Sequence, residues 1–481
     1  MTGGSELCGL DAVRLAGLLR RGEVSAREVV AAHIAQVERV DGTVNALVTR
    51  TFEQATRQAS AADEALAGGV APGLLHGLPV AHKDLADTAG IRTTYGSPIF
   101  AEHVPDTDAL HVARIRAAGA ICLGKTNTPE FGAGSQTFNT VFGATANPYD
   151  PTLTPGGSSG GAAAALAARE VALADGSDMG GSLRNPASFC NVVGLRPSPG
   201  RVPTTPSADV WSPLSVVGPM GRTVADTALL FLAMAGPDPR VALALDGPAG
   251  PACDDPTRIT GLLDGDLHGV RVAFSPDLGG LPVDRRVRRA LAGVPELFAA
   301  LGATVVDAQP DLTGADEVFA TERAFAYALA YGPLLARHRD RMKDTVVWNT
   351  EQGLAQTSAD LRRATRLRTA LTARMAEFFA DVDVLACPTV QVPPFDLSTE
   401  WVHEIDGVPM STYIDWMASV CRISATGSPA MSVPVAFTPE GLPVGLQLVG
   451  RPREDWALLR VAHAVEQAAG VSDRPPAIAV N

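Results

Sequence analysis

The sequence predicts an α/β fold in which a mixed β-sheet is covered by helices on both faces. Short apolar runs alternate with longer segments of helical periodicity from one end of the chain to the other. The chain has 481 residues, of which 46% are hydrophobic and 19% charged, which is enough to bury a large core. No internal repeat or linker divides it, so we expect one domain over residues 1–481.

Residues 1 to about 70 are predicted to be helical. Ser25 and Glu28 have the spacing of a capping box, in which two side chains satisfy backbone N–H groups at a helix start. Apolar residues follow at helical spacing, and a second helical stretch over 52–67 ends at two glycines. An apolar run at 78–81 then predicts the first strand of the core.

The core is predicted over about 77–230 and again over about 383–470, with a variable excursion over about 235–375 between these parts. Within the excursion, 235–266 is rich in Pro, Gly and Asp and is typical of a surface loop. The elements expected after the first strand are helix 108–118, strand 120–123, helix 160–168, strand 171–174, strand 270–274, helix 283–302, strand 303–307, helices near 314–340 and 358–380, strands 383–387, 430–436 and 444–449, and helix 454–468.

Composition excludes several classes of function. Lys and Arg number 39 against 52 Asp and Glu, so the net charge is −13, and no basic block indicates a nucleic-acid or membrane partner. The first residues do not resemble a secretory leader, and six scattered cysteines are typical of free thiols, so we expect a cytoplasmic protein. Nine dispersed histidines show no metal-ligand spacing, so neither a metal nor a cofactor is expected.

Two glycine-flanked serines, Ser158 and Ser182, lie 24 residues apart within residues 154–201. Glycines beside a serine allow a sharp turn and expose backbone N–H groups, which an oxyanion hole requires. A phosphate-binding loop is one interpretation, but no Walker or dinucleotide motif is present. A nucleophile elbow partnered by His463 is another, although prolines replace the strand it requires. A serine nucleophile with a lysine base, or two tight packing loops, complete the alternatives.

Four segments, at 77–84, 124–131, 154–201 and 441–450, resemble the amidase signature family, in the family's order. The resemblance implies that Ser182 is the nucleophile, that Ser158 follows a cis peptide bond and relays a proton, and that Lys83 is the base. Ser159 is then expected to be a spare hydroxyl. The resemblance also implies an oxyanion hole formed by the N–H groups of Met179, Gly180, Gly181 and Ser182, and it favours a homodimer. Ser177 stands where the family often has threonine.

A lysine with an ordinary pKa of ~10.4 acts as a base only when neutral, which requires burial without a carboxylate partner. We therefore expect Asp84 to point away from Lys83. Lys125 and His82 are expected to have packing roles, and Arg184 to fix its loop through contact with Asp178.

The predicted function is amide C–N hydrolysis of a small molecule through an acyl-enzyme. The alternatives are the glutamine-dependent amidotransferase A subunit, or an esterase, carbamate or hydrazide hydrolase with the same triad. The amidotransferase is disfavoured here because residues 410–420 look unlike the corresponding run of that protein and because the chain is acidic.

An aromatic or hydrophobic acyl group is predicted from a concentration of rings. Four aromatic residues lie within 395–416, where about one is expected from the composition. The resemblance places the opposite wall of the acyl pocket near 131–134. The expected pocket residues are Phe131, Gly132, Gly134, Phe395, Trp401, Tyr413 and Trp416.

Overall fold

A computed structural model describes residues 4–480, and within them the chain forms one large mixed sheet. Eleven strands follow the order β1-β3-β2-β6-β8-β7-β14-β15-β11-β9-β10. Two short hairpins, β4/β5 and β12/β13, lie outside it. The strands are β1 Leu47–Arg50, β2 Pro79–Lys83, β3 Ile121–Thr126, β4 Phe138–Asn139, β5 Gly143–Ala144, β6 Leu173–Asp178, β7 Val193–Arg196, β8 Val216–Gly221, β9 Arg271–Phe274, β10 Thr304–Val306, β11 Val384–Pro388, β12 Glu404–Ile405, β13 Val408–Pro409, β14 Ala430–Phe437 and β15 Pro443–Gly450.

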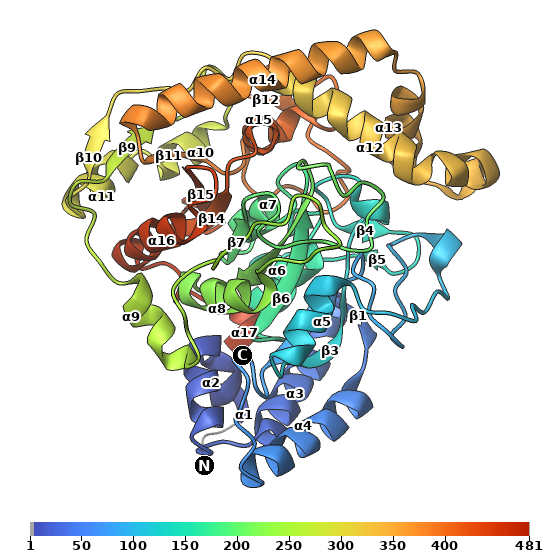
Figure 1. The fold of residues 1–481 in the computed structure, drawn as a ribbon, viewed down its shortest axis with the longest axis vertical. Helices are drawn as coiled ribbons and strands as arrows, with labels where there is room; N and C mark the ends of the chain where they lie inside the picture. Colours follow the sequence, from blue (N-terminus) through green and yellow to red (C-terminus); the bar gives the residue numbers. More distant parts are fainter. Residues whose placement is uncertain (1–3, 481) are drawn as a thin grey trace.

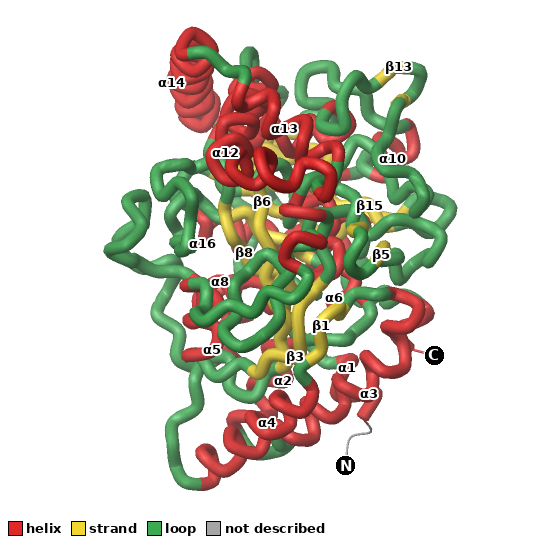
Figure 2. Tube along the Cα trace, turned by 90° about the vertical axis from the view of Figure 1, so that its right-hand side faces the viewer, coloured by secondary structure: helices red, strands yellow, loops and turns green. Residues whose placement is uncertain are grey.

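Helices lie on both sides of this sheet, with α5 and α8 on one side and α6 on the other (Figure 2). Figure 1 shows α12 and α14 together at the end of the molecule opposite the N-terminal helices. The helices are α1 Gly4–Gly9, α2 Ala12–Arg20, α3 Ala26–Val44, α4 Phe52–Ala67, α5 Leu110–Ala117, α6 Gly160–Ala167, α7 Arg184–Phe189, α8 Val224–Met234, α9 Ile259–Leu263, α10 Arg285–Ala290, α11 Val294–Ala300, α12 Ala315–His338, α13 Asp344–Leu354, α14 Ser358–Asp381, α15 Ala418–Thr426, α16 Asp455–Ala469 and α17 Ala477–Val480.

The predicted α/β class is confirmed, and local chemistry explains several elements. Ser25 and Glu28 form the expected capping box at the start of α3. Strands β2, β3 and β8 are buried at every position, as strands covered on both faces must be. All eight residues of α6 are small or aliphatic and buried, which lets this helix pack closely on the sheet.

One predicted helix is wrong. The segment expected to be a single helix over 283–302 is two short helices, α10 and α11. Gly293 precedes α11 and Pro295 lies in its first turn, where a proline is tolerated because its N–H would have no helical partner. The strands β7 and β8 and the helix α13 are further elements that the hydrophobic pattern does not predict.

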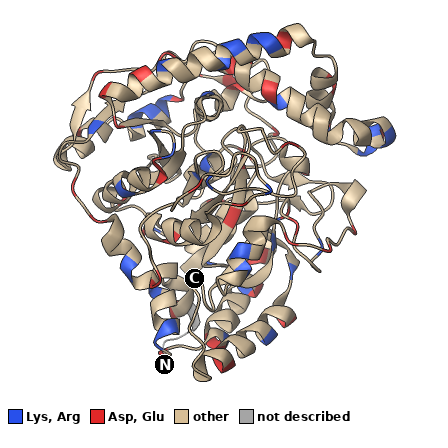
Figure 3. Ribbon diagram, viewed as in Figure 1, with Lys and Arg blue, Asp and Glu red and all other residues tan. Residues whose placement is uncertain are grey.

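Charged residues are distributed unevenly over the elements of the fold. In the view of Figure 3, basic and acidic residues are interspersed along α14, while the ribbon in the middle of the molecule is mostly neutral. Among residues 4–480, no helix combines the length and the apolar character that crossing a bilayer requires.

Candidate active site

The site forms where two neighbouring parallel strands end. Strands β2 and β6 are paired in parallel through Val80 and Leu173, so their carboxyl ends lie at the same edge of the sheet. Lys83 is the last residue of β2, and Ser177 and Asp178 are the last two of β6. Polar groups at such an edge converge from different segments of the chain.

The Lys83 ammonium group is surrounded by hydroxyls. Its Nζ atom lies 2.7 Å from Ser158 Oγ, 2.9 Å from Ser159 Oγ and 3.1 Å from Ser177 Oγ. The side chain is 1% exposed. Ser159, the hydroxyl expected to be spare, contacts the same nitrogen as Ser158, and its lesser part in catalysis stays a prediction.

Burial lowers the pKa of Lys83 to about 7, and the nearby carboxylates Asp178 and Asp175 oppose this shift only in part. Both carboxylates are already engaged elsewhere: Asp178 pairs with two arginines and Asp175 with His82. Asp84 accepts hydrogen bonds from Thr94, as its predicted orientation away from Lys83 requires. Within the described residues, no carboxylate lies within ion-pair distance of Lys83.

A glycine-rich turn carries Ser158 to the lysine. The peptide bond between Gly157 and Ser158 is cis, as the family resemblance implies. The turn leads directly into α6, whose second residue, Gly161, packs on the backbone of Asn127. A Cβ at Gly161 would lie 2.3 Å from Asn127 N, so only glycine permits this approach.

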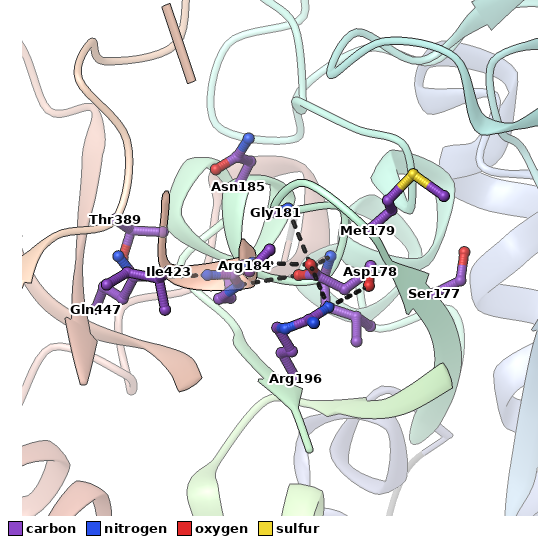
Figure 4. A network of polar contacts seen from close by, with 12 residues as sticks. Ser177, Asp178, Met179, Gly181, Arg184, Asn185, Arg196, Thr389, Ile423 and Gln447 are labelled. Atoms are coloured by element: carbon purple, nitrogen blue, oxygen red, sulfur yellow. Dashed lines mark hydrogen bonds and ion pairs between the residues drawn. The ribbon is translucent and has the colours of Figure 1, made fainter. Parts of the chain in front are cut away.

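Asp178 organises the loop that carries Ser182 (Figure 4). Its carboxylate pairs with Arg184 at 2.8 Å and Arg196 at 3.4 Å, and these contacts hold its pKa well below the usual range even though burial raises it. It also accepts the N–H of Gly181 at 2.9 Å. The expected set of oxyanion donors is therefore corrected, since the N–H of Gly181 is engaged within the loop.

A cavity of about 260 Å³ opens beside these serines. Ser158, Ser177 and Ser182 line it together with Met179. Phe131 and Gly132 also line it, whereas Gly134 does not. Two of the three pocket residues expected near 131–134 therefore line the cavity, together with both candidate serines.

The aromatic residues of 395–416 do not line this cavity, so this part of the predicted acyl pocket is wrong. Trp416 is fully buried and packs edge-on against Phe395, with ring centroids 5.3 Å apart. Trp401 packs against His403. The hydroxyl of Tyr413 contacts Arg323, so this ring supports a cavity residue from behind. These rings fill the core formed beneath α12 and α14.

Helix α12 supplies the cavity residues that sequence reasoning misses. Arg323, Tyr327 and Tyr331 face the cavity, and the ring of Tyr331 stacks on that of Phe131 with centroids 4.5 Å apart. Their i, i+4, i+8 spacing places them on one face of a helix, which is the signal that could have found them. That spacing alone does not distinguish a core-facing stripe from a cavity wall.

The remaining candidates have structural roles. Lys125 Nζ donates to the carbonyl of Ala86 and to Thr88 Oγ1, and His82 contacts Asp175. Arg184 holds the loop through Asp178, as expected. His463 is buried on α16 beside Asp264 and does not line the cavity of Ser158 and Ser182, so nothing in this geometry supports the nucleophile-elbow interpretation.

In this geometry a lysine, rather than a histidine, lies beside a cluster of serine hydroxyls at the edge of an α/β sheet. A family model described as Amidase matches residues 28–459, and the chain belongs to this family.

The proteins that this chain resembles have several different named activities. The chain is 37% identical to the A subunit of glutamyl-tRNA(Gln) amidotransferase from Moorella thermoacetica, over 99% of this chain and 100% of that protein. A bacterial aryl acylamidase of the amidase signature family superposes with a TM-score of 0.89 at 27% identity, covering 97% of this chain and 98% of that one. The amidotransferase A subunit of Thermotoga maritima superposes with a TM-score of 0.76 at 28% identity, covering 96% and 95%.

The Asp178 network yields a prediction about stability. Replacing Asp178 by Asn leaves two fully buried guanidinium groups, those of Arg184 and Arg196, without their anion. We expect a loss of about 3–5 kcal/mol in the free energy of unfolding, measured by chemical denaturation. Glu351→Gln, which breaks an exposed pair with Arg339, is the control and should have a much smaller effect. Equal losses in the two variants would contradict this role for Asp178.

Proposed function

We propose that the protein cleaves the C–N bond of a carboxamide through an acyl-enzyme on Ser182, with Ser158 as proton relay and Lys83 as base. The observation that carries this proposal is the 2.7 Å contact between Lys83 Nζ and Ser158 Oγ in a buried site without a competing carboxylate. A serine hydroxyl becomes a strong nucleophile only when a base removes its proton. A lysine with a pKa of about 7 is partly neutral at physiological pH and can be that base.

Ser182 Oγ attacks the carbonyl carbon while its proton passes to Ser158 Oγ and the proton of Ser158 passes to Lys83 Nζ. Backbone N–H groups of Met179, Gly180 and Ser182 receive the developing oxyanion. The proton then returns through Ser158 to the departing nitrogen, which leaves as ammonia or an amine. Water repeats the sequence on the ester and releases the acid.

Two substrate classes compete for this machinery. Curated relatives with 35–37% identity over almost the whole chain include amidotransferase A subunits from several bacteria, which favours the alternative stated above over an aromatic acyl group. The failure of the 395–416 rings to reach the cavity points the same way. On this account the substrate is glutamine, and a partner protein receives the ammonia. The homodimer expected from the family resemblance belongs instead to a stand-alone amidase, whereas a cytoplasmic location belongs to both proposals.

Aryl amides are the second candidate. The stacked rings of Phe131 and Tyr331 form an apolar wall of the cavity, and the aryl acylamidase superposes more closely than the amidotransferase from Thermotoga maritima. A flat acyl group packs well against such a wall.

Replacing Ser182 by Ala tests the nucleophile. We expect kcat to fall by at least about 10³-fold, because the proposed acyl-enzyme forms on this hydroxyl and alanine has none. The thermal unfolding midpoint should not change, since Ser182 lies at the cavity surface. The measurement is hydrolysis of an activated amide together with labelling by a fluorophosphonate. Persistent labelling of the variant would refute the assignment.

Replacing Lys83 by Arg tests the base. Arginine keeps the positive charge but does not deprotonate in proteins, so this variant should be as inactive as Lys83→Met. Lys343→Arg is the matched control, because Lys343 pairs with Glu400 and has no proposed role as a base. Substantial turnover by Lys83→Arg, measured at saturating substrate, would overturn the role of Lys83.

A direct comparison of glutamine with benzamide decides between the substrate classes. If the amidotransferase account holds, kcat/KM for ammonia release should favour glutamine by at least about tenfold, since the two amides place different groups in one cavity. Protection of Ser182 from fluorophosphonate labelling by each amide gives a second reading that needs no turnover. Preference for benzamide in both measurements would instead favour the aryl amidase account.

A further inference from the structure

Arg323 is a buried cation without an anion. Its side chain is 4% exposed and sits on α12, one turn before Tyr327. The other strongly buried arginines, Arg184, Arg196 and Arg201, each pair with an aspartate. Among the described residues, no carboxylate lies within ion-pair distance of Arg323. Burying an unpaired charge is costly, so this guanidinium is held here for a reason other than internal pairing.

Neutral groups hold one edge of the guanidinium. Nη2 donates to Tyr413 Oη at 2.7 Å and to Tyr327 Oη at 3.0 Å, and Nε donates to Asn349 Oδ1 at 3.2 Å. The rings of Tyr327 and Tyr413 also lie 4.6 and 5.7 Å from its central carbon. These contacts fix the side chain in one orientation while leaving its positive charge uncompensated.

The other edge faces the candidate active site. Among the described residues, Nη1 donates a hydrogen bond only to Met179 Sδ, at 3.2 Å. A thioether sulfur is a weak acceptor. Met179 directly follows Asp178 and precedes the loop of Ser182, and Arg323 lines the same cavity as Ser158 and Ser182. A substrate bound at these serines therefore lies beside the two Nη1 N–H groups of Arg323, which lack a strong acceptor.

We propose that Arg323 binds a carboxylate of the substrate, so that this enzyme acts on amides that also carry a carboxylate. The inference rests on the proposed amide cleavage and narrows its substrate class. A carboxylate supplies both the missing anion and strong acceptors for Nη1, and arginine forms its best hydrogen bonds with that group. Glutamine and the half-amides of dicarboxylic acids meet this requirement, whereas simple acyl amides and anilides do not.

Matched substrate pairs test the proposal. Succinamate and butyramide differ mainly in a carboxylate that replaces a methyl group, and 4-carbamoylbenzoate and benzamide form an aromatic pair. We expect wild-type kcat/KM to favour the carboxylate member of at least one pair by about tenfold or more. Arg323→Gln should lose that preference, chiefly through KM, and Arg323→Lys should keep part of it. Arg368→Gln, which removes a charge paired with Glu322 outside the cavity, should keep it fully.

A binding measurement separates failure of this inference from failure of the proposed function. Calorimetry with Ser182→Ala protein should detect binding of succinamate or 4-carbamoylbenzoate, and the added change Arg323→Gln should abolish it, with no turnover required. The proposal is overturned if the wild type shows no carboxylate preference and Ser182→Ala binds neither anion. It is equally overturned if Arg323→Gln, correctly folded, lowers kcat/KM for both members of a pair alike. A benzamide preference that Arg323→Gln removes would mean that the guanidinium stacks on a ring instead.

Discussion

The site depends on keeping one buried lysine free of a carboxylate partner. A pKa lowered from 10.5 to about 7 corresponds to a free-energy difference of about 5 kcal/mol between the charge states, and burial supplies it. Two aspartates are close enough to undo this effect. The fold prevents that by engaging Asp178 with Arg184 and Arg196, and Asp175 with His82. Burial lowers the pKa of Lys83, and these contacts keep both carboxylates from pairing with it.

Sheet topology provides the convergence on which this chemistry relies. The parallel pairing of β2 with β6 places Lys83 beside Ser177, and the start of α6 delivers Ser158 and Ser159 to the same edge. Helix α12, far along the chain, then covers the site. The ring of Phe319 comes so close to Gly180 that a Cβ there would lie 2.7 Å from it. The proposed catalytic residues thus come from the core, whereas α12 contributes aromatic rings and the Arg323 guanidinium to the cavity wall.

Local signals predicted the core well, because capping residues and apolar periodicity act over a few residues. The capping box of α3, the strand ending at Lys83 and the serine loops are of this kind. The cavity wall could not be predicted in the same way, since it depends on contacts between distant segments. Trp416 and Phe395 form a dense aromatic cluster in the sequence and yet pack into the core. No local sequence motif marks Arg323. Its proposed role can be inferred only from the three-dimensional structure, in which its hydrogen-bond partners are neutral.

The most direct test of this account is the pH dependence of the rate at which a fluorophosphonate phosphonylates Ser182. A neutral lysine must start the reaction, so the rate should rise with pH and level off, with an apparent pKa near 7 that belongs to the coupled Lys83–Ser158–Ser182 group. Lys83→Arg should react slowly and without this rise. A rate that does not depend on pH between about 5 and 9, or one that rises only above about pH 10, as expected for an ordinary lysine, would contradict the account.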